Sequence, residues 1–284
     1  MNRYDFVYLF DVKDANPNGD PDAGNLPRVD PETGEGLVTD VCIKRKLRNY
    51  VGLKGGPGKR IYVKEGTFTN ASNREAWIKV GLEPSKELPK DKEKAQAITK
   101  FMCDNFYDIR AFGAVMSHEV NCGQVRGPVQ ISFARSVDPI VSLEHSISIC
   151  AAKREDKPLK DQIGIQGRKF TVPYGLYRAY GFVNPFLAEQ TGFSEDDLKL
   201  LWEALINAFQ FDQSAARPAG SMAPRKLFVF KHDKQLGNAP SHKLFERAQI
   251  TRKDSSKPPR AFSDYEVKVD WSNPPAGVEL IEML

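Results

Sequence analysis

Apolar residues occupy both faces of the segment 3–12, a pattern typical of a strand in the middle of a sheet. The Pro- and Gly-rich residues 13–38 that follow predict a long loop. Residues 39–51 then carry apolar side chains at helical spacing, with Thr39 or Asp40 in position to cap the first turn. The same spacing predicts a second helix over 91–107.

Two strands, a helix and a final strand are expected in the second half of the chain. Residues 128–137 and 140–150 alternate between apolar and polar positions around an Asp-Pro turn signal, which predicts a β-hairpin. Ser194 precedes three acidic residues and an apolar stripe, so a capped amphipathic helix is expected over 194–209. Residues 226–231 complete the series as a strand.

Without its longer insertions, the predicted order is βαββαβ, the ferredoxin-like order of RNA-recognition modules. The fold class is therefore expected to be α+β, with a single RRM-like domain spanning residues 1–284. Insertions at about 52–127 and 151–193, and a C-terminal extension at 232–284, exceed ordinary loops. Connections of this length are usually functional or form subdomains of their own.

Composition limits where a binding site for nucleic acid can lie. The chain has 284 residues, of which 40% are hydrophobic, enough for one large domain or two modest ones. Its formal net charge of +4 is only mildly basic, so such a site must be local. The four cysteines form no CxxC motif, and neither a signal peptide nor a membrane-length apolar run is present. We expect a reducing cytoplasm and no membrane partner.

One stretch of the chain concentrates positive charge. Between Val41 and Lys64 there are eight basic residues and no acidic residue: Lys44, Arg45, Lys46, Arg48, Lys54, Lys59, Arg60 and Lys64. Like charges this close repel one another, which costs stability unless an anion offsets them. A nucleic-acid backbone is the commonest such anion. A solvated basic helix is the alternative, and the sequence leaves both interpretations open.

Several catalytic motifs are absent. Gly58-Lys59 is followed by Arg60 instead of Ser or Thr, which excludes a phosphate-binding P-loop. The four histidines are scattered without zinc-site spacing, and no GxSxG nucleophile motif occurs. These motifs therefore give no support for catalytic residues, a metal or a cofactor.

An acidic loop is the one feature that points toward chemistry. Asp14, Asp20, Asp22 and Asp30 lie in the loop that precedes the basic helix. Clustered carboxylates beside a phosphate site can hold Mg²⁺ for nuclease chemistry. Asp and Asn next to Pro or Gly also form turns, and we favour this second interpretation.

Two segments combine glycine with arginine. Arg126-Gly127-Pro128 leads into the predicted hairpin, and the loop 211–222 joins the last helix to the last strand through Arg217. Glycine lets a phosphate approach the backbone, and arginine can bind it with two parallel hydrogen bonds. A surface ion pair is the alternative for each arginine.

Five segments occur in an order that is more specific than any one of them. They are DANPNGDP (14–21), TDVCIKRKLR (39–48), DIRAFGAVM (108–116), RGPVQ (126–130) and GRKFTVPYGLY (167–177). Together they resemble the backbone subunit of the type I-C CRISPR Cascade complex, which is a member of the Cas7 family in the RAMP superfamily. The resemblance covers roughly residues 3–232.

This resemblance implies an RRM-like palm with a finger insertion at 52–127 and a thumb insertion at 151–193. Copies of such a subunit stack along one crRNA as a helical filament, together with other Cascade subunits. The guide then pairs with target DNA, and a separate helicase-nuclease cuts it. The backbone subunit itself has no catalytic role.

The resemblance also suggests which residues contact RNA. Lys44 and Arg48 share one helix face by their i,i+4 spacing, with Arg45 and Lys46 in support, while Val41 and Leu47 are expected to face the sheet. Further contacts are expected from Asn16, Asn18, Arg126, Arg217, Ser221 and Met222. The candidate thumb contains Lys153, Arg154, Ile163, Ile165, Arg168 and Lys169, and Ile163 or Ile165 would be inserted into a base step.

Two other functions remain open at this stage. Related type III backbone subunits use a loop aspartate to cut RNA, and Asp22 or Asp30 could act as that residue in a metal-dependent ribonuclease. A lone RRM-like regulator that binds one RNA site is the other alternative, although its compact fold would not need the long insertions.

Overall fold

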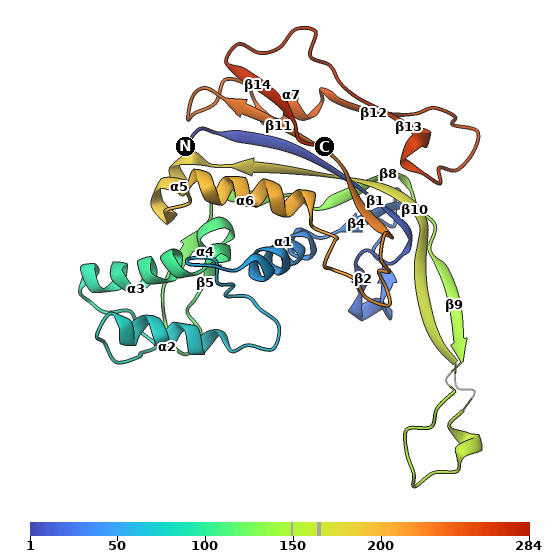
Figure 1. Ribbon diagram of the computed structural model, residues 1–284, viewed down its shortest axis with the longest axis horizontal. Helices are drawn as coiled ribbons and strands as arrows, with labels where there is room; N and C mark the ends of the chain where they lie inside the picture. The colour runs from blue at the N-terminus through green and yellow to red at the C-terminus, as the bar shows by residue number, and fades with distance from the viewer. Residues whose placement is uncertain (149, 164–165) are drawn as a thin grey trace.

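A large antiparallel sheet forms the centre of the computed structural model, which describes residues 1–148, 150–163 and 166–284 (Figure 1). Its strand order is β14-β11-β1-β10-β8-β4, and β7 and β9 also pair with β10. The bounds are β1 Tyr4–Ala15, β4 Glu35–Val38, β7 Val129–Ile131, β8 Ala134–Pro139, β9 Leu143–Ser148, β10 Gln166–Val183, β11 Met222–His232 and β14 Val278–Glu282. β1 pairs with β10 and β11, one on each side, as its apolar sequence predicts.

The predicted hairpin between 128–137 and 140–150 is wrong. β8 pairs with β4 and β10, and β9 pairs with the beginning of β10, so neither half of the expected hairpin pairs with the other. β10 falls inside the segment 151–193 that was predicted as an insertion, and most of it lies beside β1 in the middle of the sheet. Alternation locates strands correctly here but does not identify their partners.

Glycine and proline explain why β10 is not recognisable as a strand. Such residues normally weaken a strand prediction. Gly181 lies directly under the ring of Phe6 on β1, and a Cβ at this position would come within 1.9 Å of the ring. Pro173 stands where β10 stops pairing with β9, at Thr171, and starts pairing with β1, at Val172. Gly181 and Pro173, which weaken the strand prediction, thus let β10 pack against β1 and change its pairing partner from β9 to β1.

β9 and the first part of β10 project from the sheet as a two-stranded arm, residues 143–171, with the loop around η2 (Leu159–Asp161) at its far end (Figure 1). Every residue of β9 is exposed. The arm is therefore rooted in a central strand, and its outer part makes little contact with the rest of the chain.

Helices cover one face of the sheet (Figure 1). α1 (Asp40–Lys54) begins at Thr39, whose side chain accepts a hydrogen bond from the Cys42 N–H. α6 (Glu195–Ile206) begins at Ser194 with a capping box, as predicted. Leu47 is fully buried, which contributes about 1.5–3 kcal/mol. Val41, which we also expected to face the sheet, is 63% exposed because it lies on the opposite side of the helix.

The C-terminal part of the chain covers the other face. It contains α7 (Ser241–Phe245) and the paired strands β12 (Ala248–Arg252) and β13 (Tyr265–Val269). Leu244, Ala248 and Tyr265 form one buried cluster with Val7 and Leu9 of β1. Both faces of the sheet are therefore closed by the chain itself.

The segment 52–127 contains the predicted helix 91–107, observed as α3 (Lys92–Asn105) with Asp91 as its N-cap. It also contains two helices and two strands that were not predicted individually. These are α2 (Thr69–Lys79), α4 (Tyr107–Phe112), β5 (Gly113–Val115) and β6 (Gln124–Arg126). Trp77, Ile98 and Met102 form a second buried cluster within this segment. The helical insertion thus has an apolar core of its own.

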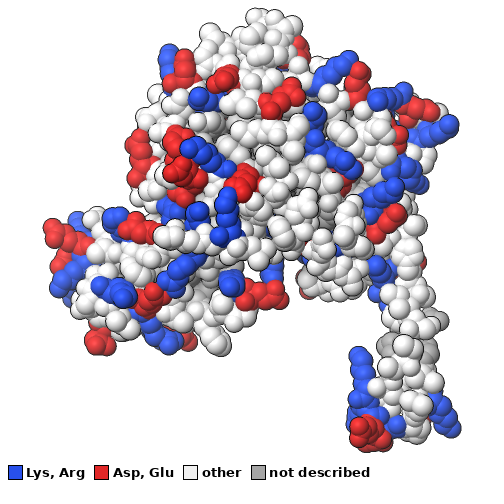
Figure 2. All heavy atoms as spheres, in the orientation of Figure 1, with Lys and Arg blue, Asp and Glu red and all other residues white. Residues whose placement is uncertain are grey.

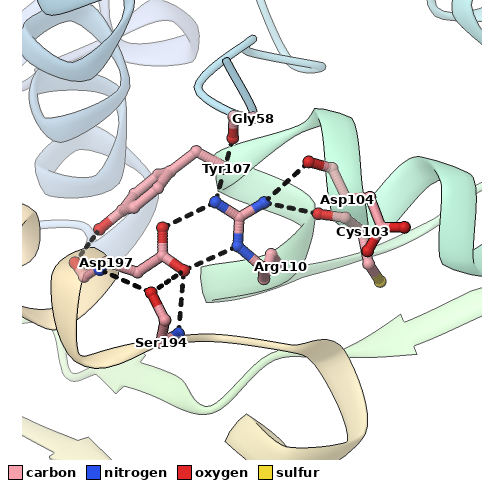
Figure 3. A network of polar contacts seen from close by, with 7 residues as sticks. All are labelled: Gly58, Cys103, Asp104, Tyr107, Arg110, Ser194 and Asp197. Atoms are coloured by element: carbon pink, nitrogen blue, oxygen red, sulfur yellow. Dashed lines mark hydrogen bonds and ion pairs between the residues drawn. The ribbon is translucent and has the colours of Figure 1, made fainter. Parts of the chain in front are cut away.

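A buried ion pair joins this insertion to the main sheet's helices (Figure 3). Arg110 of α4 donates to both carboxylate oxygens of Asp197, at 2.8 and 2.7 Å, and to the carbonyls of Cys103 and Gly58. The two charged side chains are 9% and 10% exposed. Asp197 is also the capping residue that Ser194 faces, so one arginine connects α3, α4, α6 and the loop after α1.

We predict that Arg110→Ala lowers the free energy of unfolding by about 3–5 kcal/mol, because the Asp197 carboxylate stays buried without its cation. Urea denaturation measures this loss. As a control, Lys199→Ala removes the exposed ion pair with Asp196 on α6, the helix that carries Asp197. This variant is expected to change the free energy of unfolding by no more than about 0.5 kcal/mol. Similar small losses in both variants would contradict the role assigned to Arg110.

Candidate nucleic-acid interface

The basic helix is not an uncompensated cluster of charge. Six of the eight cations between Val41 and Lys64 form ion pairs with carboxylates that lie outside this stretch: Lys44 with Asp40, Arg45 with Glu65, Lys46 with Asp212, Arg48 with Asp108, Lys54 with Glu203 and Arg60 with Glu75. The argument that an external anion must offset their repulsion is therefore wrong. Folding brings the missing negative charge from five other segments and from the helix start.

Lys44 and Arg48 do share one face of α1, as their spacing predicts. Lys44 Nζ lies 2.9 Å from Asp40, and Arg48 Nε lies 2.9 Å from the buried carboxylate of Asp108. Both cations also lie over the ring of Phe112, at 5.8 and 5.3 Å from its centroid. Their side chains are only 12% and 13% exposed, so both are held in place by contacts within the chain. Their predicted contact with RNA stays a prediction.

A cationic cavity of about 500 Å³ lies beside the N-terminal end of α1, where Cys42 belongs to its lining. Three segments far apart in sequence line it: the loop 16–19 with its neighbours 24–25, residues 168–170 of the arm, and residues 215–217. It contains three cations, Arg168, Lys169 and Arg217, and no carboxylate among its described lining residues. We call it the guide-side cavity because it brings together three groups that the family resemblance singled out as candidates for RNA binding.

Two asparagines shape the loop on one side of the guide-side cavity. Asn16 is 6% exposed, and its side-chain N–H donates to the Asn25 carbonyl at 2.6 Å. Asn18 Oδ1 accepts hydrogen bonds from the N–H and the hydroxyl of Thr39, the residue that caps α1. These asparagines therefore fix the loop against the start of the basic helix. Burial raises the pKa of the neighbouring Cys42 thiol, so this wall of the cavity is uncharged at neutral pH.

Asp212 fixes the opposite wall. It pairs with the buried Lys46 of α1 and accepts a hydrogen bond from Arg217 Nε at 3.0 Å. The N–H of Asn16 donates to the carbonyl of Ala216 in the same loop. The loop 211–221 is thus tied to both α1 and the asparagine loop. Lys46, which we expected to support RNA binding directly, lies beneath this wall and is 3% exposed.

Besides the four cations of α1, three further predicted RNA-binding residues lie outside the guide-side cavity. Arg126 lines a different cavity, of about 930 Å³, between α3 and α5 (Pro185–Thr191), and this cavity lies at the far end of the sheet from the arm (Figure 1). Ser221 is 9% exposed and donates to the Pro218 carbonyl. Met222 is the first residue of β11 and belongs to the main hydrophobic core.

The candidate thumb residues divide between the two ends of the arm. Arg168 and Lys169 lie at its base in the guide-side cavity, and Arg168 also pairs with Glu144 across the two strands. Lys153, Arg154 and Ile163 lie in the loop at the far end, where Arg154 pairs with Asp156 and Ile163 is 42% exposed. Figure 2 shows Lys and Arg side chains on both sides of this end. Ile165 lies outside the described residues.

Other residues of the guide-side cavity were not predicted. Ile147 and Phe170 extend its lining across the two strands of the arm. No short-range signal identifies them, because both depend on the pairing of β9 with β10, which the sequence did not reveal.

The acidic loop makes turns, as we favoured. β2 (Gly19–Asp20) and β3 (Leu26–Pro27) form a small ribbon, and Asp20 caps the 3-10 turn that contains Asp22. Asp30 accepts hydrogen bonds from the N–H groups of Glu32 and Thr33. A hydrogen bond from Arg135 lowers the pKa of Asp30 below its ordinary value. No group of three or more metal-ligating His, Cys, Asp or Glu side chains occurs within the described ranges.

In the part of the chain that the structure describes, no helix has the length and apolar character needed to cross a bilayer. A curated relative, "CRISPR-associated protein Cas7" of Haloferax volcanii, is 29% identical in an alignment 252 positions long that covers 81% of this chain and 70% of the relative.

A solved structure shares the fold. A chain of a "CRISPR RNA-guided surveillance complex, pre-nicking" aligns with a TM-score of 0.51 and 18% identity, over 81% of this chain and 78% of that one. A chain of another "CRISPR RNA-guided surveillance complex" aligns at a TM-score of 0.46 and 17% identity, over 81% and 69% of the two chains. The family model described as "CRISPR-associated protein Cas7" matches residues 2–270. Because this match spans almost the whole sequence, the chain belongs to the Cas7 family of CRISPR-associated proteins.

Proposed function

We propose that this chain is a crRNA-binding backbone subunit of a type I-C CRISPR Cascade surveillance complex. In this role it polymerises along the guide RNA and presents it for pairing with target DNA in antiviral defence. The proposal rests on the family and on one observation, the guide-side cavity. Arg168, Lys169 and Arg217 line a space that no described carboxylate lines. Arg168 and Arg217 pair with Glu144 and Asp212, which lie outside this lining, and Lys169 makes no ion pair among the described residues.

The chemistry of the guide-side cavity suits a sugar-phosphate chain. Arg168 and Arg217 can each donate to phosphate oxygens, and Lys169 adds a point charge. Asn16 Oδ1 has no hydrogen-bond partner among the described residues and lies in the cavity wall. Contacts of this kind bind the backbone and leave the base edges free, as a guide that must pair with another strand requires.

We also propose that the sheet is an RRM-like palm. The strands β11, β1, β10 and β8 stand in the spatial order 4-1-3-2 of a βαββαβ unit, with α1 and α6 on one face. RNA-recognition modules bind RNA on the other face of their sheet. Here the C-terminal part of the chain covers that face. RNA would therefore run along the loop edge of the sheet, where the guide-side cavity opens.

The arm is proposed as the thumb that reaches the next copy in the filament. Two strands with β9 fully exposed leave it available to a neighbour, and the far end carries both basic and acidic side chains. Such head-to-tail contacts do not close on themselves, so RNA length and the other Cascade subunits would set the number of copies. The exposed Ile163 is the described residue at which insertion between bases is proposed.

We propose a binding role without catalysis. The oxygens of Asp30 are engaged by Arg135 and by two backbone N–H groups, and Asp22 lies in an exposed turn capped by Asp20. The Asp30 carboxylate thus holds a turn, and the backbone N–H of Asp22 belongs to another, which supports turn formation over a ribonuclease. A cytoplasmic location is part of the same proposal.

The variant Arg168→Ala/Lys169→Ala/Arg217→Ala is expected to weaken RNA binding regardless of sequence. Each lost phosphate contact lowers the slope of log affinity against log salt by roughly 0.7 for a single strand, or about 2 in total. Fluorescence anisotropy with labelled RNA over a salt series measures the slope. Lys86→Ala/Lys90→Ala/Lys92→Ala removes the same charge from exposed positions outside the guide-side cavity and serves as the matched control.

The pair Lys44→Ala/Arg48→Ala tests the assignment made from sequence separately. A lower slope of log affinity against log salt would place α1 in the RNA site. An unchanged slope would mean that Lys44 and Arg48 serve only in their ion pairs with Asp40 and Asp108. Equal slopes for the triple variant, its control and the unmodified protein would exclude the guide-side cavity.

Assembly should follow the length of the RNA. Size-exclusion chromatography with light scattering is expected to show particle mass rising in steps of one subunit as the RNA is lengthened. A complex that keeps one protein per RNA at every length would favour the lone regulator instead.

Incubation of the assembled protein with complementary RNA and Mg²⁺ is expected to leave the RNA intact on a denaturing gel. Asp22→Ala and Asp30→Ala provide the controls. Fragments that appear with the unmodified protein and disappear with either variant would establish the ribonuclease.

A further inference from the structure

A second cationic cavity lies at the other end of the basic helix. It has a volume of about 330 Å³ and is lined by the Gly-rich end of α1, by Ser72 of α2, and by three cations, Lys59, Arg60 and Lys64. None of its described lining residues is a carboxylate. The cavity between α3 and α5 contains Glu93, Asp104 and Glu189 beside its cations, so an all-positive lining is not general on this surface.

Two of the three cations are free to bind a ligand. Arg60 is held by Glu75, with two hydrogen bonds of 2.8 and 2.7 Å, and it stacks on Phe106 at 4.5 Å. Lys59 and Lys64 make no ion pair with any carboxylate that the structure describes, and they are the two members of the basic run left uncompensated. A phosphate at this position would restore the charge balance that the rest of the run obtains internally.

An exposed aromatic ring lies directly beside this cavity. Phe68 is 84% exposed, which is unusual for so large an apolar side chain. It lines a neighbouring space of about 550 Å³ that shares Thr67 with the cationic cavity. The charges in this neighbouring space are balanced, Arg74 against Glu119, so it suits an uncharged flat group. Cations next to an exposed ring are the two elements with which proteins bind single-stranded nucleic acid.

The loop that carries these groups is fixed in advance. The carboxylate of Asp108 accepts the N–H groups of Tyr62 and Val63, at 2.8 and 3.0 Å. The Thr67 hydroxyl donates to the Lys64 carbonyl at 2.8 Å, which closes a turn with Gly66 in the left-handed region at φ 71°. Lys64 and Phe68 therefore stand on either side of one turn, and little ordering is needed on binding.

We propose that residues 59–68 form a second site, for single-stranded nucleic acid. Lys59 and Lys64 bind a phosphate, and Phe68 stacks on an adjacent base. α1 has 15 residues, so this site and the guide-side cavity lie at opposite ends of a helix about 22 Å long. Paired bases are stacked inside a duplex and cannot cover Phe68, so the site prefers an unpaired strand. Unpaired DNA and unpaired RNA share this chemistry.

Binding of a labelled oligothymidine and a labelled oligouridine to the guide-loaded assembly tests the site, and the same measurement on the free chain keeps the test independent of guide loading. Phe68→Ala is expected to weaken binding roughly 5- to 100-fold, as expected for the loss of one stacked base. Lys59→Ala/Lys64→Ala is expected to lower the salt-dependence slope by about 1. Comparing the two oligonucleotides identifies whether DNA or RNA is preferred.

Matched controls are Ile78→Ala, which removes an apolar side chain that is 64% exposed, and Lys86→Ala/Lys90→Ala. Both should bind as the unmodified protein does. The proposal is overturned if Phe68→Ala and Lys59→Ala/Lys64→Ala also bind normally, or if a duplex of the same length binds as tightly as the single strand. Normal guide binding by these variants, with loss of the second strand alone, separates this site from the guide-side cavity.

Discussion

Two buried charged side chains on the short helix α4 attach the helical insertion to the helices of the central sheet. α4 places Arg110 against Asp197 of α6 and Asp108 against Arg48 of α1, so the helical insertion is attached to both core helices by ion pairs. Apolar contact alone would let the two hydrophobic clusters slide, because such contacts have no preferred direction. An ion pair with additional hydrogen bonds to backbone groups is directional, so it fixes the position of α4 relative to α1 and α6. The loop that carries Lys59 and Lys64 depends on this attachment, because Arg110 also donates to the Gly58 carbonyl and Asp108 accepts the N–H groups of Tyr62 and Val63.

The distribution of negative charge decides which cations are available. The basic run looks uniform in sequence, yet folding pairs six of its members with carboxylates and leaves Lys59 and Lys64 without one among the described residues. The arm adds Lys169, which makes no ion pair among the described residues, and Arg168, which pairs with Glu144 but keeps an exposed side chain. Local density of charge is therefore a poor guide to a binding surface, and pairing across the fold is the more informative property.

Sequence reasoning succeeded where the signal is local. The caps at Thr39 and Ser194 and the apolar stripes behind them located α1 and α6, and a strand apolar on both faces located β1. It failed where the structure depends on distant partners. Gly181 of β10 is explained by its close contact with the Phe6 ring, which the sequence does not reveal. The expected hairpin also left out the pairing of β9 with β10. The guide-side cavity was half predicted, since Arg217 and the asparagine loop were singled out but their meeting with the arm was not.

The continuity of β10 has a consequence for assembly. Its 18 residues run from the arm into the centre of the sheet, and the residues beyond Thr171 are hydrogen-bonded to β1. The direction in which the arm points is therefore inherited from the register of the sheet. Insertion of a single residue into β10 would turn one part of the strand over relative to the other. In the filament proposed above, that small local error would be repeated at every joint and would accumulate as a change of pitch.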